Sequence, residues 1–208
     1  GPPRGAPLDL PPGVPVVSFV SRGLEAYRGF DHFMEIARRV SRRHPDVHFA
    51  VCGAEQTYYG NELSHLRAPS FKAHVLERVP VDPSRVHFLG HVPEESVADL
   101  FRITTAHFHW TVVHAMSWSP LQALAAGALV IAPDCEPVRD VIQDGANGQL
   151  FPPEDVDAAA ERILHALADP GAAAAMRARA RESILARHAP AVACPKIADF
   201  ILEGTGAD

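Results

Sequence analysis

Two arginines and two glycines share one short segment, residues 21–29. Arg22 and Arg28 carry planar guanidinium groups, which match the oxygens of a phosphate in geometry and charge. The glycines would let a ligand approach the backbone, and the start of the following helix would add partial positive charge. This combination predicts a clamp for a diphosphate. The alternative is that the arginines pair with Glu25 or Asp31 at the surface.

A second segment with anion-binding character runs from Ser117 to Gln122. Ser119 is a good N-cap, Pro120 suits the first helical position, and Gln122 stands where a capping box places its amide. The unpaired N–H groups at such a helix start form an anion site. Gln122 has two interpretations, because its amide either completes the cap or hydrogen-bonds to a ribose or sugar hydroxyl.

Three histidines and a run of arginines also stand close together in the sequence. His107 and His109 would share one face of a strand, with His114 nearby. No carboxylate or cysteine completes a metal site there, so we expect the first two to be buried or hydrogen-bonded structural residues, and no metal. For the arginines at 38, 39, 42 and 43, a solvated helix face is favoured over a membrane or partner patch.

The surrounding elements must position these residues, and the hydrophobic pattern predicts them. Short apolar runs at 14–20, 47–52, 86–89, 106–110, 129–132 and 148–151 are typical of buried strands. Helical patterns fall at 29–44, 61–79 with a break near Pro69, 94–102, 120–126, 137–143, 155–168, 172–187 and 190–202. This alternation predicts an α/β fold, a Rossmann-like doubly wound parallel sheet with helices on both faces.

Loops at the carboxyl ends of parallel strands hold the ligand in such folds. The loops concerned are 21–29, 53–61, 90–93, 110–119 and 133–137, so Gly53 and Gly90 join the candidate site. Residues 1–13 are rich in proline and glycine and predict a linker, which begins with the Gly–Pro pair that a protease leaves after tag removal. Residues 14–203 then form a single domain.

Composition argues against several classes of function. The 208 residues carry a net charge of −6 and 7% aromatic side chains, which argues against nucleic acid as a partner held by bulk charge or base stacking. Three cysteines without a CxxC pair favour a reducing compartment. With no signal peptide or spanning apolar run, we expect a cytoplasmic protein. Dinucleotide-fold, P-loop and hydrolase-elbow signatures are absent.

Taken in order, these segments resemble the C-terminal, donor-binding domain of family 4 glycosyltransferases of the GT-B type. Residues 21–29 resemble the family's G-R-x-x-x-x-K-G stretch, with serine for the first glycine and arginine for lysine. Residues 86–92, VHFLGHV, resemble its V-x-F-x-G-x-V turn, and residues 119–134, SPLQALAAGALVIAPD, resemble its helix and following strand. Residues 138–148 resemble a run that ends in D-G-x-N-G. The resemblance covers about residues 14–190.

The resemblance implies a retaining, metal-independent transferase, without a cofactor, that binds a nucleotide-diphospho-sugar. The residues it assigns to this donor are Arg22, Arg28, Gly53, Gly90, His91, Val92, His114, Ser117, Trp118, Ser119 and Gln122. The arginines would hold the diphosphate, and the turn at 90–92 would contact the nucleobase through backbone groups. Backbone amides at 117–119 would face the phosphates or the sugar.

The same resemblance implies partners beyond the donor. An N-terminal acceptor-binding domain, absent from these residues, would be needed in cis, so we expect the isolated chain to bind donor weakly and transfer nothing. Peripheral membrane contact is compatible with this reading, and a bacterial origin with a role in polysaccharide, lipopolysaccharide or secondary-metabolite assembly is the expected setting.

Two glutamates with seven residues between them commonly bind the donor sugar and the ribose in this family, and His114 and Gln122 occupy these positions here. A bacterial subgroup with R-G-x-E-x-x-R-G-F and S-W-S, as at 22–30 and 117–119, also lacks the first glutamate. Gln122 can still bind a hydroxyl, but without charge assistance. The alternatives are an active transferase, a degenerate non-catalytic binding module, or an unrelated Rossmann-like sugar-phosphate enzyme such as an epimerase.

Overall fold

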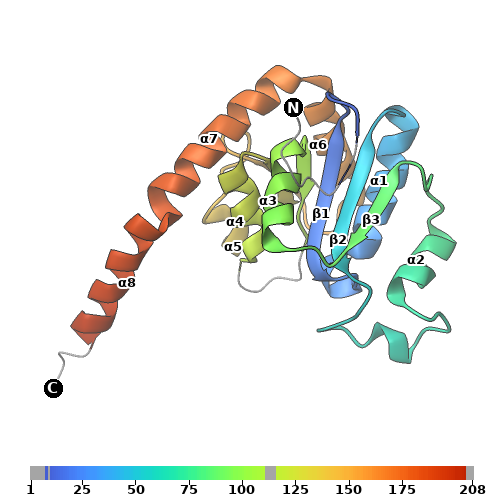
Figure 1. The fold of residues 1–208 in the computed structure, drawn as a ribbon, viewed down its shortest axis with the longest axis horizontal. Coiled ribbons are helices and arrows are strands. Elements are labelled where there is room, and N and C mark those ends of the chain that lie inside the picture. Colours follow the sequence, from blue (N-terminus) through green and yellow to red (C-terminus); the bar gives the residue numbers. More distant parts are fainter. Residues whose placement is uncertain (1–7, 9, 111–115, 205–208) are drawn as a thin grey trace.

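Six parallel strands form one sheet in the order β3-β2-β1-β4-β5-β6 (Figure 1). The computed structural model describes residues 8, 10–110 and 116–204. The strands are β1 (Val16–Gly23), β2 (His48–Ala54), β3 (Val86–Gly90), β4 (Ala106–Phe108), β5 (Leu129–Pro133) and β6 (Gln149–Phe151). Each lies within three residues of a predicted strand at both ends, so the predicted Rossmann-like parallel sheet is confirmed.

Helices connect the strands and cover both faces of the sheet (Figure 1). They are α1 (Phe30–Arg43), α2 (Phe71–Arg78), α3 (Glu94–Ile103), α4 (Trp118–Ala126), α5 (Glu136–Arg139), α6 (Val156–Ala168), α7 (Pro170–His188) and α8 (Pro190–Gly204). Two short 3-10 turns, η1 (Ala26–Arg28) and η2 (Glu62–Ser64), lie in the loops after β1 and β2. The predicted break near Pro69 is confirmed, because the residues around it separate η2 from α2.

Both faces of the sheet are buried, as the apolar runs of its strands predict. On one face, Phe19 of β1 stacks on Phe33 of α1, with 5.1 Å between the ring centroids, and α6 completes the same cluster. On the other face, Val130 of β5 packs with Leu124 of α4 and Ile184 of α7. The strands are therefore held from both sides, and their ends form a fixed support for the loops.

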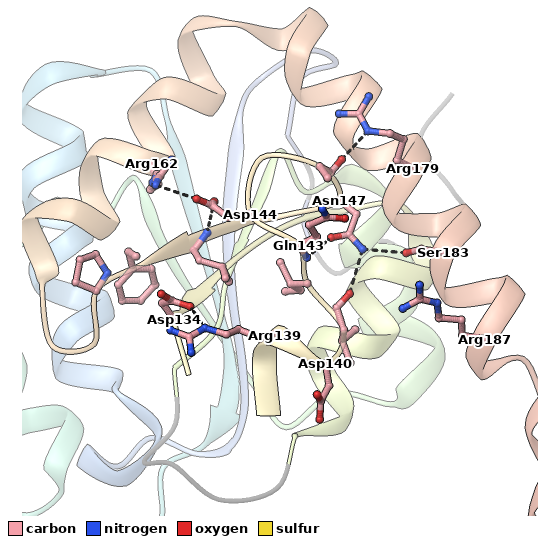
Figure 2. Close-up of a pocket in the computed structure, with 16 residues that line it drawn as sticks. Asp134, Arg139, Asp140, Gln143, Asp144, Asn147, Arg162, Arg179, Ser183 and Arg187 are labelled. Carbon is pink, nitrogen blue, oxygen red and sulfur yellow. Dashed lines mark hydrogen bonds and ion pairs between the residues drawn. The ribbon is translucent and has the colours of Figure 1, made fainter. Parts of the chain in front are cut away.

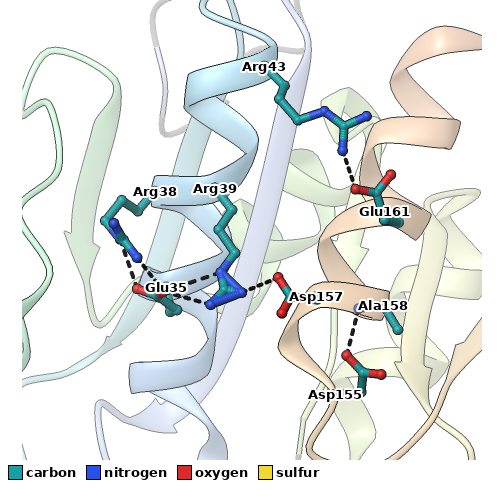
Figure 3. Close-up of polar contacts among 8 residues, drawn as sticks. All are labelled: Glu35, Arg38, Arg39, Arg43, Asp155, Asp157, Ala158 and Glu161. Atoms are coloured by element: carbon teal, nitrogen blue, oxygen red, sulfur yellow. Dashed lines mark hydrogen bonds and ion pairs between the residues drawn. The ribbon is translucent and has the colours of Figure 1, made fainter.

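The basic run of α1 faces acidic side chains of its own helix and of α6 (Figure 3). The ion pairs join Glu35 to Arg38 and Arg39, Arg39 to Asp157, and Arg43 to Glu161. Each such pair, being partly exposed, contributes little to stability. Together they neutralise much of the run, which supports the predicted structural helix surface over a membrane or partner patch.

Part of the predicted linker belongs to the core. Leu8 is buried in a cluster with Val16, Ala50 and Leu100, and Leu10 packs against the same cluster. Burial of these two leucines removes apolar surface from water and anchors the segment to the sheet. The prediction of a linker over residues 1–13 therefore does not extend to them.

The last helix, α8, extends away from the sheet (Figure 1). α7 packs on α4 and β5, whereas α8 continues beyond it and contacts α7. Large apolar side chains of α8 are exposed, among them Phe200 at 78% and Leu202 at 69%. No helix in the described part of the chain has the length and apolar character needed to cross a membrane.

Candidate ligand-binding site

A cavity of about 470 Å³ lies where the carboxyl ends of β1, β2 and β3 meet the start of α4. This is the edge at which parallel α/β sheets hold ligands. Ten predicted residues line it: Arg22, Arg28, Gly53, Gly90, His91, Val92, Ser117, Trp118, Ser119 and Gln122. The remaining one, His114, lies outside the described residues. The fold thus brings together segments that are up to a hundred residues apart in the chain.

Sequence reasoning missed part of the lining. The additional residues are Val20, Ser21, Cys52, Val97, His109, Trp110 and Met116. Ser21 and Cys52 directly adjoin predicted residues at strand ends, and Trp110 and Met116 fall within the 110–119 loop, which are the signals that could have found these four. Burial raises the pKa of the Cys52 thiol to about 12. Cys52 therefore stays protonated at neutral pH and is an apolar wall rather than a nucleophile.

Both arginines of the 21–29 segment rest on tyrosines of the loop that follows β2. The guanidinium carbon of Arg22 lies 4.2 Å from the centre of the Tyr58 ring, and that of Arg28 lies 4.8 Å from the centre of the Tyr59 ring. Hydrogen bonding to the Tyr59 hydroxyl raises the pKa of Arg22 above its ordinary value. Arg28 Nη1 also donates to Ser117 Oγ at 3.3 Å, which links this segment to α4.

Glu25 does not sit at the surface as an ion-pair partner for these arginines. Its side chain is fully buried, and Oε2 accepts backbone N–H bonds from Tyr58, Tyr59 and Gly60 at 2.8, 2.9 and 3.2 Å. Asp31 in turn contacts the Nδ1 atom of His32 at 3.3 Å. The alternative of surface pairing with Glu25 is therefore wrong, since backbone groups of another loop take up this carboxylate.

The turn from the arginine segment into α1 requires a glycine. Gly29 adopts a φ of +72°, which disfavours any residue with a Cβ atom. A Cβ atom there would also overlap the side chain of Trp110, one of the cavity walls. Trp110 also stacks on His32 of α1, with 4.2 Å between ring centroids. Gly29 thus sets both the start of α1 and the position of this tryptophan.

The helix beside the cavity begins two residues earlier than predicted. Its N-cap is Ser117, not Ser119, and Trp118 is its first residue. Ser117 makes no side-chain cap bond, and its Oγ accepts from Arg28 instead. Residues 118 and 119 lie in the first turn of α4, where backbone N–H groups have no acceptor within the helix itself. The anion site at this helix start stays a prediction, with its origin at Ser117 instead of Ser119.

Gln122 is not part of a capping box. With α4 beginning at Trp118, position 122 lies beyond the first turn and too far from the N-cap. Its Nε2 atom instead donates to Glu94 Oε1 of α3 at 2.8 Å. A carboxylate can only accept, so the amide nitrogen must face Glu94. The amide oxygen is thereby left for a donor on another side, and Gln122 lines the cavity.

The two strand-end histidines are buried, as predicted. His107 Nδ1 lies 3.0 Å from Ser18 Oγ, and its ring meets Phe101 edge-on at 4.9 Å. Complete burial lowers the pKa of His107 to about 3, so the ring is neutral. His109 is also buried and additionally lines the cavity. Within residues 8, 10–110 and 116–204, no three His, Cys, Asp or Glu side chains are grouped as metal ligands.

A second cavity, of about 800 Å³, lies beside β6 between α5, α6 and α7 (Figure 2). Several of its charged groups are paired with one another, as Arg139 is with Asp134 at 2.5 Å and Arg162 with Asp144 at 3.3 Å. Asn147 donates to Val141 O and Ser183 Oγ at 3.0 Å each. These contacts hold the 143–148 turn in place, which gives the polar groups of this cavity a structural role. The smaller cavity at the strand ends is therefore the better candidate site.

Comparison with known proteins places this site in context. Residues 6–183 match the family described as Glycosyl transferases group 1. A D-inositol 3-phosphate glycosyltransferase from Kribbella flavida is 26% identical over 160 residues. This alignment covers 75% of the present chain and 36% of that protein. The chain therefore spans about a third of the length of this curated relative.

Solved structures show the same fold. Anabaena HepE in complex with UDP and glucose matches with a TM-score of 0.77 and 19% identity, over 90% of this chain and 48% of that one. The C-terminal domain of a glycosyl transferase group 1 family protein from Francisella tularensis matches with a TM-score of 0.71 and 18% identity. That match covers 85% of this chain and 87% of the other.

The expected resemblance to the C-terminal half of GT-B glycosyltransferases is thereby confirmed. The reading as an unrelated sugar-phosphate enzyme is overturned, because the family model matches most of the chain. With the sheet, the cavity and the family match in agreement, this chain belongs to the group 1 glycosyl transferases.

Proposed function

We propose that this chain is the donor-binding half of a retaining glycosyltransferase, and that its cavity binds the diphosphate and nucleoside of a sugar nucleotide. The observation that carries the proposal is the meeting of two arginines and a helix start in one cavity. Arg22 and Arg28 line it together with Ser117, the N-cap of α4, and Arg28 donates to that serine. Two guanidinium groups beside a helix N-terminus suit a diphosphate.

In the proposed reaction the acceptor's hydroxyl oxygen bonds to the anomeric carbon of the sugar while the bond from that carbon to the diphosphate breaks. The hydroxyl proton leaves with the released nucleoside diphosphate. Negative charge grows on the diphosphate as its bond breaks, and fixed positive groups that meet this charge lower the barrier. Arg22, Arg28 and the start of α4 would supply them without a metal ion.

The acceptor would be bound by a further domain. Matched proteins are longer, since this chain covers 36% of the Kribbella relative and 48% of the Anabaena structure. The structure of the latter holds UDP and glucose, which supports a sugar-nucleotide donor for the present cavity. We expect this chain alone to bind a nucleotide and to transfer no sugar.

A degenerate binding module is the second candidate function. Gln122 stands where the family commonly has a glutamate, and its amide is hydrogen-bonded to Glu94. Residue 122 itself therefore offers the donor no carboxylate. Such a module would bind the nucleotide without transfer. A sugar-transfer assay of the longer protein, with its acceptor domain, separates the two candidates, because only a transferase would form a glycosylated product.

Calorimetric titration of this chain with UDP, GDP, dTDP and ADP, with and without magnesium, tests the donor site. We expect selective binding of one nucleotide, independent of magnesium, and at least a tenfold loss in Arg28→Ala. This loss follows because a charge-assisted hydrogen bond to phosphate is among the stronger polar contacts.

Arg181→Ala is the matched control, because Arg181 binds a backbone carbonyl near the end of α4, outside this cavity. It should leave nucleotide binding unchanged. Equal affinities for Arg28→Ala and the unaltered chain would contradict a donor site at these arginines. Sugar transfer by this chain alone would contradict the need for an acceptor domain.

A further inference from the structure

The loop formed by residues 55–60, which we call the tyrosine loop, is tied to the arginine segment by a buried carboxylate. Glu25 sits between Arg22 and Arg28 in sequence, yet its side chain points to this other loop. Oε2 accepts three consecutive backbone N–H bonds, from Tyr58, Tyr59 and Gly60. A buried polar group is costly unless hydrogen bonds compensate it. Glu25 therefore fixes the tyrosine loop against the arginine segment.

Two further contacts close the same junction. A Cβ atom on Gly23 would lie 2.7 Å from the Tyr58 ring and would overlap the backbone of Gln56, so only glycine lets the two segments approach this closely. Glu62, just after the tyrosine loop, accepts from the backbone N–H of Ala26 at 2.7 Å. The junction is thus held from both sides.

The side chains of the tyrosine loop meet the two arginines that line the cavity. Tyr58 lies under Arg22 and Tyr59 under Arg28, at distances typical of cation–π contacts. Hydrogen bonding to Arg22 and then to Arg28 lowers the pKa of the Tyr59 hydroxyl. Neither tyrosine lines the cavity itself, and Tyr58 and Tyr59 are 40% and 53% exposed. Their contacts with the arginines are therefore not explained by burial in a core.

We infer that Tyr58 and Tyr59 are positioning residues that hold Arg22 and Arg28 toward the cavity in readiness for a diphosphate, with Glu25 fixing the tyrosines. This inference rests on the proposed donor site. A free arginine side chain loses conformational freedom when it binds an anion, and a ring that already restrains it reduces this loss. A ring contacts the flat face of a guanidinium, whereas phosphate oxygens accept from N–H groups that lie in the guanidinium plane.

Inorganic pyrophosphate is the probe, because it presents the diphosphate without base or sugar. We expect Tyr58→Leu and Tyr59→Leu each to weaken pyrophosphate binding about threefold, and the double variant about tenfold, from the usual strength of exposed cation–π contacts. Tyr58→Phe keeps the aromatic face and should bind like the unaltered chain. Tyr59→Phe loses only the hydroxyl and should fall between the two.

The thermal midpoint of each variant is measured beside the affinity, and Phe200→Leu on α8 serves as an exposed aromatic control. Rescue by phenylalanine at an unchanged midpoint identifies positioning, which a merely structural role would not produce. If the leucine variants bind pyrophosphate as tightly as the unaltered chain, or more tightly, while Arg22→Ala/Arg28→Ala loses binding, the inference is overturned and the donor site stands. If the double arginine variant binds pyrophosphate as the unaltered chain does, or if the unaltered chain does not bind it, the positioning role and the donor site are both contradicted.

Discussion

At the scale of single residues, Gln122 depends on a partner from another helix. Its amide nitrogen is directed to Glu94 of α3, so the amide oxygen is what it can offer to a hydroxyl group. The negative charge of Glu94 also polarises the amide and strengthens the oxygen as an acceptor. A carboxylate near this position is therefore present, although it comes from residue 94 and not from residue 122.

This pairing predicts the outcome of restoring the family glutamate. Gln122→Glu alone would put two carboxylates at hydrogen-bond distance, and their repulsion would displace the new side chain. We expect nucleotide binding about fivefold weaker at pH 7, the effect of roughly one unit-charge contact in water. Glu94→Gln/Gln122→Glu exchanges the two groups and should recover the affinity. Calorimetry with the nucleotide that binds best measures both.

Gln143→Glu, the same chemical change outside this cavity, serves as the control and should have no effect. Stronger binding by Gln122→Glu alone, with no further change in the exchanged variant, would show that Glu94 does not act on residue 122.

At the scale of elements, the turn between β1 and α1 is constrained by the glycine at position 29. Gly29 and Gly127 both have positive φ, +72° and +84°, at the ends of turns. Only at Gly29 would a Cβ atom meet a neighbour, the Trp110 ring, whereas Gly127 has open space around it. Alanine substitutions at the two positions therefore distinguish the cost of backbone strain from the added cost of steric overlap.

Gly127→Ala should lower the free energy of unfolding by about 1 kcal/mol, from the left-handed backbone alone. Gly29→Ala should lower it by about 3 kcal/mol, because overpacking against Trp110 adds to the same backbone cost. Urea unfolding followed by circular dichroism gives both values. Equal losses in the two variants would mean that Trp110 moves aside without cost, and that the cavity wall is less fixed than the structure indicates.

At the scale of the whole molecule, the pH dependence of stability follows from the neutral histidine in the sheet. His107 has a pKa of about 3 in the folded chain against about 6.5 when unfolded. Below pH 6.5 the unfolded chain binds a proton that the folded chain does not, so stability falls as the pH falls. Burial also lowers the pKa of His48 and His87, which lie 2.8 Å apart, and they act in the same direction.

We expect His107 alone to lower the free energy of unfolding by about 1.6 kcal/mol between pH 6.5 and pH 5, because the slope approaches about 1.4 kcal/mol per unit only below the unfolded-state pKa. Urea unfolding at the two pH values measures the loss. In His107→Gln, the loss of unfolding free energy between the two pH values should be smaller by the contribution of His107. In His165→Gln, on α6, the loss should equal that of the unaltered chain. A loss of the same size in His107→Gln would locate the pH dependence in other groups.

Much of the fold could be read from the sequence, because hydrophobic period is a local property. The run at 129–132 and the amphipathic pattern at 29–44 became β5 and α1 within one or two residues. Local capping signals were less reliable. Ser117 and Ser119 are equally good N-cap residues by type, and the helix begins after Ser117, which also contacts Arg28. Capping rules use only neighbouring residues and do not include such a contact.

The sequence by itself determined the sheet, the arginine clamp as a candidate and the family, since each rests on residue types at short, regular spacings. Only the tertiary structure decided what the polar side chains touch. Glu25 meets backbone groups 33–35 residues away, and Gln122 meets Glu94 across 28 residues. Such partners are set by how strands and helices stack. Their sequence separation carries no periodic signal, so the tyrosine loop and the paired Gln122 emerge only when the chain is folded.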